Sequence, residues 1–238
     1  MGSRPTGAHG RIARDRASEA IEDYAKAIYA LSRREEGPIG TSSLAERLGV
    51  SPGTVTSMLK RMDALGLLRY EPYRGVELTE AGTRMALEVI RHHRIIESYL
   101  AEALGMPWDR VHDEAEVLEH YISEELEERM AAALGDPSHD PHGDPIPSSE
   151  LELAEEATRP LAGLEPGERG VFVRISDSDP EMLRYLGERG IAPGDRLELV
   201  GREPFDGPLS VRFDGGTFAL GGGLARAMRV ATAPKESS

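Results

Sequence analysis

The sequence has 238 residues, enough for one large domain or two to three small ones. It contains no cysteine, which excludes a disulfide scaffold, a thiolate metal site and a cysteine nucleophile. Residues 1–80 hold 12 of the 28 Lys and Arg and 11 of the 42 Asp and Glu, so residues 81–238 carry the acidic excess behind the net charge of −14. The first region can approach phosphate, whereas the second carries carboxylates that face water or hold cations.

The sequence shows neither a membrane-spanning nor a secretory pattern. It has no run of 18 apolar residues, and its N-terminal MGSRPTGAHGRIARDRA lacks the apolar stretch of a signal peptide. The absence of cysteine is typical of a reducing compartment. We therefore expect a cytoplasmic protein that binds neither a membrane nor a small-molecule substrate.

Residues 1–17 are rich in Gly and Arg without periodicity and are expected to form a flexible basic tail. Ser18 is the expected N-cap of the first helix, because the apolar residues that follow it, up to Leu31, have helical spacing. A short second helix is expected to begin with Thr41 as its cap and to end at Gly49.

The next segment predicts a helix and a hairpin. Ser51 is placed as the N-cap and Pro52 as the first residue of a helix that ends at Gly66. LLRYEPYRGVELT then predicts two short strands around a turn at Pro72–Gly75. A short helix, a tight turn, a second helix and a hairpin are the pattern of a winged helix-turn-helix.

The remaining elements predict a helical region followed by a β-rich one. A long helix is expected over 79–104 and a helical stretch over 108–134, which Ser123 could divide by capping a new helix. Residues 135–150 are dense in Pro, Gly, Asp and Ser and predict a loop. From about 164, short alternating runs with one helical interruption predict a small barrel.

The helix that begins at Pro52 is the second helix of the helix-turn-helix. Small hydroxyl side chains at its start can approach phosphates and base edges, and basic residues further along it can contact phosphate. The apolar positions Val55, Met58, Leu59 and Met62 are expected to face inward. Arg69, Tyr73 and Arg74 are candidates on the wing. The predicted DNA-binding residues are Ser51, Thr54, Thr56, Ser57, Lys60, Arg61 and Arg74.

Histidine and carboxylate residues recur at helical spacing in the acidic region. One set falls at i, i+4, i+7 and i+8 and would share one helix face, and another pair falls at i and i+4 on the preceding helix. Such faces are costly to bury unless a cation lies between them, and oxygen and imidazole donors without sulfur suit manganese, iron(II), cobalt or zinc. The residues are His112, Glu116, Glu119 and His120 in the first set and His93 and Glu97 in the second.

Four other histidines receive no role. His139 and His142 lie in the predicted loop, His9 lies in the predicted tail, and His92 precedes His93 but points to another side of the helix.

The sequence resembles the diphtheria-toxin-repressor family of metal-activated transcription factors. The likeness rests on the winged helix followed by IRHHRIIESYL and VHDEAEVLEHYISEELEERM, and on the loop containing PHGDPIP, and it covers residues 18 to about 230. It implies a mainly α fold with a small β domain. The implied parts are a flexible tail at 1–17, a winged helix at 18–80, a helical dimerisation and metal-binding domain at 81–150, a linker at 151–165 and an SH3-like barrel at 166–232.

The resemblance also implies two metal sites. The primary site would use Asp23, Glu116, Glu119 and His120. The ancillary site would use His93, Glu97 and His112 and would be completed from the C-terminal domain, for which Asp177 in ISDSDPEM is the nearest candidate. Iron-sensing members carry Met and Cys where this sequence has Asp23 and Glu116, which are the choices of manganese-sensing members. The compact binuclear manganese type carries a carboxylate where this sequence has Lys26, so two separated sites fit better.

We therefore expect a non-enzymatic, homodimeric repressor of metal-uptake genes that uses Mn²⁺, or alternatively Fe²⁺, to bind a palindromic operator. Two alternatives stay open. A metal-independent winged-helix regulator would bind DNA equally well in a chelator, and a two-metal hydrolase would cleave a generic phosphoester. Against the hydrolase, the sequence has no nucleophile motif near the ligands and no phosphate-binding Gly-rich loop.

Overall fold

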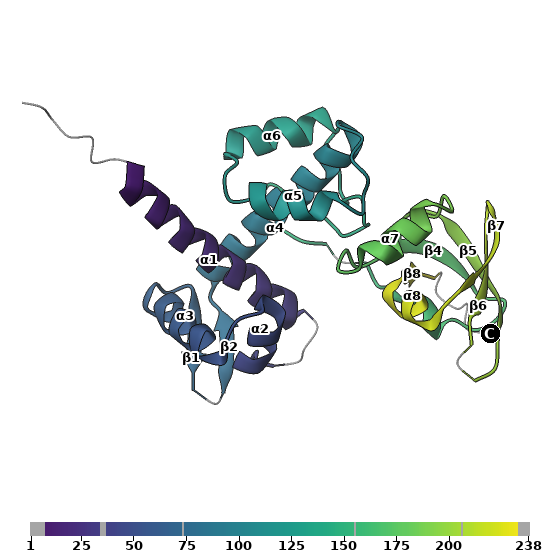
Figure 1. Cartoon of the computed structure of the whole chain (residues 1–238), viewed down its shortest axis with the longest axis horizontal. Helices are drawn as coiled ribbons and strands as arrows, with labels where there is room; N and C mark the ends of the chain where they lie inside the picture. The colour runs from purple at the N-terminus through teal and green to yellow at the C-terminus, as the bar shows by residue number, and fades with distance from the viewer. Residues whose placement is uncertain (1–7, 34–36, 73, 155, 206, 233–238) are drawn as a thin grey trace, which may run out of the picture. The chain divides into compact units, whose positions relative to one another are not determined.

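A computed structural model describes residues 8–33, 37–72, 74–154, 156–205 and 207–232. The chain forms two compact units. Figure 1 labels their helices and strands. Unit 1 comprises residues 1–91 and 149–152, and unit 2 comprises 92–148 and 153–238. Among the described residues, no helix is long and apolar enough to cross a membrane.

Unit 1 has the predicted winged-helix order. Its elements are α1 (Ala8–Ser32), α2 (Thr41–Leu48), α3 (Pro52–Ala64), β1 (Leu68–Glu71), β2 (Gly75–Leu78) and the first half of α4 (Glu80–Glu102). β1 and β2 pair antiparallel, with Leu68 opposite Leu78. One apolar core joins α1, α2, α3 and the hairpin, and its largest fully buried members include Ile28, Leu44, Leu59, Met62 and Leu68.

Local signals explain the boundaries of the helix-turn-helix. Gly49 ends α2 with a φ of 64°, a left-handed conformation that costs glycine nothing. Ser51 caps α3 by accepting the main-chain N–H of Thr54 at 3.2 Å, and Pro52 occupies the first helical position. The predicted ends of α3 and of the hairpin strands are confirmed to within two residues.

Two predicted helix starts are wrong. α1 begins at Ala8, ten residues before the expected cap, and the Ser18 hydroxyl donates instead to Glu22 one turn along the same helix. The segment before Ser18 is rich in Ala and Arg, which are strong helix formers, so the helix extends through most of the expected tail. Thr41 is the first residue of α2, and its N-cap is Gly40, which offers no side-chain oxygen. Residues 1–7 lie outside the described residues.

The first part of unit 2 is helical. It contains the second half of α4, α5 (Val111–Leu118) and α6 (Glu124–Ala133), and Ser123 caps α6 as predicted by accepting the N–H of Leu126 at 3.3 Å. Two small apolar clusters hold these helices, one around Ile96, Val111 and Ala115 and one around Ile95, Ala131 and Ile146. α5 ends at Leu118; Glu119 is its C-cap, still in helical conformation with its N–H bonded to the Ala115 carbonyl, and His120 lies in the turn that follows.

The second part of unit 2 is a sheet of six antiparallel strands in the order β3-β8-β4-β5-β6-β7. The strands are β3 (Arg159–Pro160), β4 (Arg169–Arg174), β5 (Arg196–Arg202), β6 (Leu209–Phe213), β7 (Gly216–Leu220) and β8 (Arg229–Ala231). The helices are η1 (Leu161–Gly163), α7 (Pro180–Gly187) and α8 (Gly222–Ala227), the last in a segment that was expected to be strand only.

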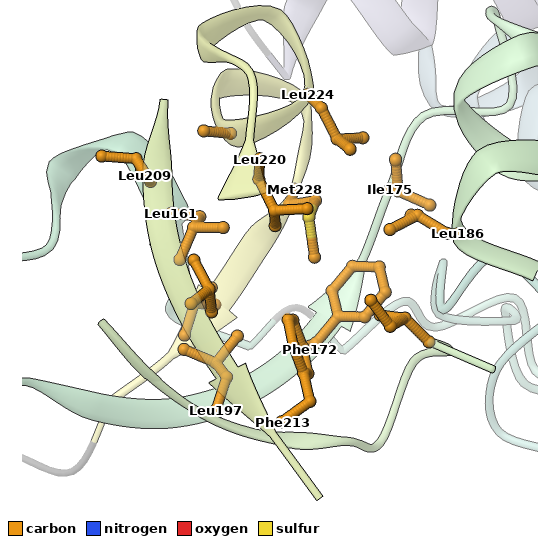
Figure 2. Packing of buried hydrophobic residues seen from close by; sticks show 14 of the residues in the cluster. Leu161, Phe172, Ile175, Leu186, Leu197, Leu209, Phe213, Leu220, Leu224 and Met228 are labelled. Carbon is orange, nitrogen blue, oxygen red and sulfur yellow. The ribbon is translucent and has the colours of Figure 1, made fainter. Parts of the chain in front are cut away.

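The core of this β-rich part is apolar. Figure 2 shows Phe172, Leu186, Leu220 and Met228 pointing into one interior. Each of these four side chains is essentially inaccessible to solvent. At about 25 cal/mol per Å² of buried apolar surface, such a cluster contributes much of the stability of this part. The core holds β4 firmly, and the segment that follows β4 enters the site described below.

Candidate metal centre and DNA-binding surface

The middle of α4 carries two donors one turn apart on a buried face. His93 is 5% exposed and Glu97 is 1% exposed. Residues at i and i+4 share a helix face, and the His93 Nε2 atom lies 3.1 Å from Glu97 Oε1. This face belongs to unit 2, as do α5 and the segment after β4.

Two further donors complete a four-residue cluster of His93, Glu97, His112 and Asp177. His112 comes from α5, and its Nδ1 atom lies 3.5 Å from Glu97 Oε1 and 2.9 Å from Asp177 Oδ2. Each residue offers a donor atom, and these atoms all lie within 4.8 Å of one another. The structure thus brings together all four residues predicted for the ancillary site, including the one from the C-terminal part.

The geometry of this cluster suits a divalent cation. Both carboxylate oxygens of Glu97 and the Nδ1 atom of His112 are buried and make no hydrogen bond. Donors at right angles around an ion, each at about 2.1 Å, lie about 3 Å apart, close to the separations seen here. Buried polar atoms without hydrogen bonds are costly, and a cation among them would remove that cost. The residues present therefore fit a metal ion.

The charges in the cluster are strongly coupled. Burial opposes ionisation of Glu97, but the close imidazoles of His112, His142 and His93 outweigh it and lower the pKa of Glu97 well below its usual value. Asp177, with Glu97, raises the pKa of His112 to about 10. Burial also opposes ionisation of Asp177, but His112 lowers its pKa. When no metal is bound, protonated His112 therefore supplies the positive charge that balances the carboxylates of Glu97 and Asp177.

The loop 135–150 packs against Glu97 of the cluster, a role that its sequence pattern did not predict. His142 is buried, with Nδ1 3.6 Å from Glu97 Oε2 and Nε2–H donating to the Trp108 carbonyl at 2.8 Å. Asp140 accepts the main-chain N–H groups of His142 and Asp144, each at 2.9 Å. The repeated Asp, Pro and Gly in PHGDPIP signalled tight turns, but not that the turns would bury a histidine.

The same loop fixes the segment that carries Asp177. Gly143 has a φ of 86°, and a Cβ atom there would lie 1.9 Å from the Val173 carbonyl oxygen. The His142 carbonyl accepts the N–H of Ile175 at 3.0 Å, and Arg174 donates to Asp144 at 3.1 Å. Only glycine allows this close approach, so the loop locks the end of β4 beside α5.

The predicted primary-site residues of unit 2 adjoin this cluster. His93 turns its Nδ1 atom to Glu119 Oε2, and the same nitrogen lies 3.8 Å from Glu116 Oε1. His120 Nε2 lies 3.7 Å from Glu119 Oε1. Glu116 is also 3.8 Å from His112 Nε2, so it lies close to both expected sets. Asp23 is half-buried on α1 in unit 1, and its contribution stays a prediction.

The predicted DNA-binding residues lie at the N-cap of α3, along α3 and on the wing, and all are exposed except Thr56, which is half-buried. Val55, Leu59 and Met62 are buried as predicted, and Met58 is partly buried against the same core. The Ser51 and Thr54 hydroxyls lie 2.8 Å apart, and those of Thr56 and Ser57 donate to main-chain carbonyls one turn back. Lys60 and Arg61 are exposed at the following turn.

On the wing, Arg69 and Arg74 are exposed, and Arg74 pairs with Glu71 at 3.1 Å. Tyr73 lies outside the described residues.

Three family models match the chain in succession. Residues 16–76 match the N-terminal DNA-binding domain of iron-dependent repressors, and residues 79–148 match their metal-binding and dimerisation domain. Residues 159–232 match the FeoA domain. The iron-dependent repressor IdeR of Mycobacterium tuberculosis (strain ATCC 25618 / H37Rv) is 40% identical over 201 residues, covering 76% of this chain and 84% of that protein.

The chain belongs to the iron-dependent repressor family. The diphtheria toxin repressor of Corynebacterium diphtheriae (strain ATCC 700971 / NCTC 13129 / Biotype gravis) is 31% identical over 222 residues, covering 89% of this chain and 96% of that protein. The predicted family and fold class are confirmed, and the match of the small β domain is to FeoA.

Solved structures of the family carry different metals. A manganese-dependent transcriptional repressor in complex with manganese has a TM-score of 0.82 and 40% identity, covering 90% of this chain and 100% of that chain. ScaR with bound Zn²⁺ has a TM-score of 0.73 and 31% identity, covering 90% of this chain and 99% of that chain. Family membership alone therefore does not choose the metal of this chain.

Proposed function

We propose that this protein is a divalent-cation-dependent transcriptional repressor that binds operator DNA through α3 and the wing. The observation that carries the proposal is the four-residue cluster, in which both carboxylate oxygens of Glu97 and the Nδ1 atom of His112 are buried without a hydrogen bond. It lies in a chain that also presents the exposed hydroxyl and basic face of α3. We assign DNA binding to residues 18–80, metal binding and dimerisation to 81–150 and the SH3-like domain to 166–232, joined by a linker at 151–165.

The chain's own residues would hold the ion as follows. Glu97 is the carboxylate that both His93 and His112 approach through its Oε1 atom. His142 lies beside the other oxygen, Oε2, and orients the carboxylate. His93 presents one ring nitrogen to Glu97 and the other to Glu119, so the two sets of donors are linked through one imidazole. A bound cation would supply the positive charge that these carboxylates otherwise obtain from protonated histidines.

Asp23 is proposed as the donor that couples this chemistry to the DNA-binding unit. It is carried by α1, which packs in the same core as the recognition helix α3. A cation that binds only the DNA-competent arrangement shifts the population toward it, by about 2.7 kcal/mol at 100 times its dissociation constant. Asp23→Ala should abolish metal-stimulated operator binding and leave the oligomeric state unchanged. Unchanged stimulation would remove Asp23 from the site.

Manganese is the proposed cofactor, with iron(II) as the alternative. Glu116 and Asp23 offer hard carboxylate oxygens, which favour manganese over softer ions. The Glu116→Cys variant should therefore relax the selectivity of DNA binding toward iron(II). An unchanged manganese preference in this variant would show that position 116 does not set the selectivity.

A homodimer on a palindromic operator is the proposed assembly. Residues 1–80 carry almost no net charge, so one unit alone has a weak field for DNA. Unit 2 exposes large apolar side chains that a partner copy could cover, namely Leu104, Val117, Leu118, Tyr121 and Leu126. Val117→Glu should give a monomer in sedimentation equilibrium, and a persistent dimer would place the interface elsewhere.

The deciding experiment is a DNA-binding titration with and without metal. DNA selected from random fragments by the Mn²⁺-loaded protein serves as probe, and fluorescence anisotropy is recorded with Mn²⁺, with Fe²⁺ under anaerobic conditions and with chelator. Strong DNA binding that the chelator abolishes supports the proposal. The ion that gives the tighter DNA binding is then identified as the cofactor. Equal binding in chelator would indicate a metal-independent regulator, and hydrolysis of a phosphoester would indicate an enzyme.

A further inference from the structure

His92 is a buried histidine outside both sets of donors described above. It precedes His93 on α4, and a step of one residue turns the side chain by about 100° around the helix axis. The side chain is 10% exposed, and its Nδ1 atom lies 3.2 Å from the main-chain oxygen of Glu119. A carbonyl oxygen only accepts hydrogen bonds, so Nδ1 carries the proton. In the neutral ring, Nε2 is then a free lone-pair donor.

Two carboxylates of α6 face this nitrogen. Glu124 is the first residue of α6 and Glu127 follows three positions later, so both lie on one face of the helix. Glu124 Oε1 lies 3.2 Å from His92 Nε2, and donor atoms of all three residues lie within 4.8 Å of one another. His92 Nε2 is buried and makes no hydrogen bond, although a carboxylate is this close. A lone pair facing two carboxylates is unfavourable unless a positive charge lies among them.

We propose that His92, Glu124 and Glu127 form a third divalent-cation site, separate from the four-residue cluster and from the set around Glu119. The 3.2 Å separation of nitrogen and oxygen is close to the roughly 3 Å expected for neighbouring ligands of one octahedral ion. A histidine that binds a metal through one nitrogen commonly donates the other N–H to a main-chain carbonyl, as His92 does. One imidazole and two carboxylates suit Mn²⁺ or Zn²⁺, with water in the remaining positions.

The surroundings favour entry and retention of a cation. The Glu124 side chain is 63% exposed, which leaves a path from solvent, whereas Glu127 and His92 form the buried floor. The first turn of α6 contains three glutamates, which concentrate negative charge beside the site. Since His92 Nδ1 is anchored on the Glu119 carbonyl, occupation of this site would also steady the turn that carries Glu119 and His120.

The test counts Mn²⁺ ions on the full-length chain. The protein is stripped with chelator, dialysed to equilibrium against Mn²⁺ alone, and the bound metal per chain is measured. Glu124→Gln removes one carboxylate charge at an exposed position. His92→Asn removes the Nε2 donor while its amide can still donate to the Glu119 carbonyl. Each variant should bind one Mn²⁺ fewer per chain than the wild type, or bind it at least tenfold more weakly.

Glu128→Gln is the matched control, because Glu128 lies on the same helix, is exposed and is absent from the cluster. It should bind as many ions as the wild type. In crystals soaked in Mn²⁺, an anomalous peak should lie beside His92 Nε2 and disappear in Glu124→Gln. The proposal is overturned if Glu124→Gln keeps the wild-type count, even when His92→Asn loses an ion, because His92 would then act only on the Glu119 turn. Metal-dependent operator binding by Glu124→Gln is measured separately, so failure of the third site leaves the proposed repressor function intact.

Discussion

The winged helix and the four-residue cluster differ in how far apart in the chain their parts lie. α3 carries its cap, its buried residues and its exposed hydroxyl face within residues 51–64. The cluster collects donors from α4, α5 and the segment after β4, which lie up to 84 positions apart between His93 and Asp177. The first surface depends on helix periodicity, whereas the second depends on a fold that holds mutually repelling carboxylates together.

The difference has an energetic consequence. Substitutions on the exposed face of α3 remove single contacts and leave the helix intact, because the residues that stabilise it lie on its other face. Substitutions in the cluster remove one member of a buried, coupled set and leave the others unpaired, which costs more than the lost contact itself. We therefore expect large effects in unit 2 and small ones on α3.

Glu97→Gln should have the largest effect. Glu97 is the residue that His93, His112 and His142 all approach, so the neutral amide removes the charge that they share. We expect the Mn²⁺ affinity of this cluster to fall by about 100-fold or more, measured by isothermal titration calorimetry. Glu102→Gln, an exposed change on the same helix, is the control and should bind like the wild type. Equal affinities in both variants would mean that the cluster is only a structural network.

The next largest expected effect is the change of Mn²⁺ affinity with pH. His112 has a pKa raised to about 10 by Asp177 and Glu97, so it is protonated at pH 7 in the metal-free protein. A metal binds only the neutral imidazole, so binding must release this proton. The apparent Mn²⁺ affinity should therefore rise about tenfold per pH unit between pH 6.5 and 7.5.

The check is calorimetry in two buffers of different ionisation enthalpy, which gives the number of protons released. His112→Ala should abolish both this release and the pH dependence that it causes. The sign is opposite for stability without metal. The raised pKa means that protonated His112 stabilises the metal-free fold fully below pH 6.5, and this contribution is lost as the pH rises toward 10.

The same contrast explains what could be predicted from the sequence. The winged helix was predicted because its signals are local: Gly49, Ser51 and Pro52 mark their own positions. Spacing placed His93 and Glu97 on one face, but the end of α5 at Leu118 depends on tertiary packing. Asp177 was named only through the family resemblance, because no local pattern links it to His112.

The buried roles of His92 and His142 could not be predicted from spacing. Both depend on which carbonyl and which carboxylate the folded chain brings to each ring nitrogen. The signal available for His142 was the run of Asp, Pro and Gly around it, which indicated a loop that needs special backbone conformations. It did not indicate that the loop would pack under Glu97.

Ser51→Ala should have a smaller effect, confined to the winged helix. It removes the side-chain oxygen that accepts the Thr54 N–H at the start of α3, and loss of such a cap costs about 1 kcal/mol of unfolding free energy. Ser57→Ala is the control, because its hydroxyl bonds a carbonyl inside the helix and its replacement should change stability by less than about 0.5 kcal/mol. Chemical denaturation measures both. Equal losses would show that the cap does not stabilise α3.

Arg61→Ala should have the smallest effect and the most specific signature. Arg61 is exposed on α3, and one phosphate contact fewer should reduce the slope of log K against log salt by about 0.9. Between 50 and 200 mM salt, that slope change alters the relative affinity by only about threefold to fourfold. Anisotropy titrations of the Mn²⁺-loaded protein across this range measure it. Arg84→Ala, exposed on α4 in the same unit, should keep the wild-type slope. If both variants shift the slope equally, the effect is one of net charge, and α3 has no special place on the DNA.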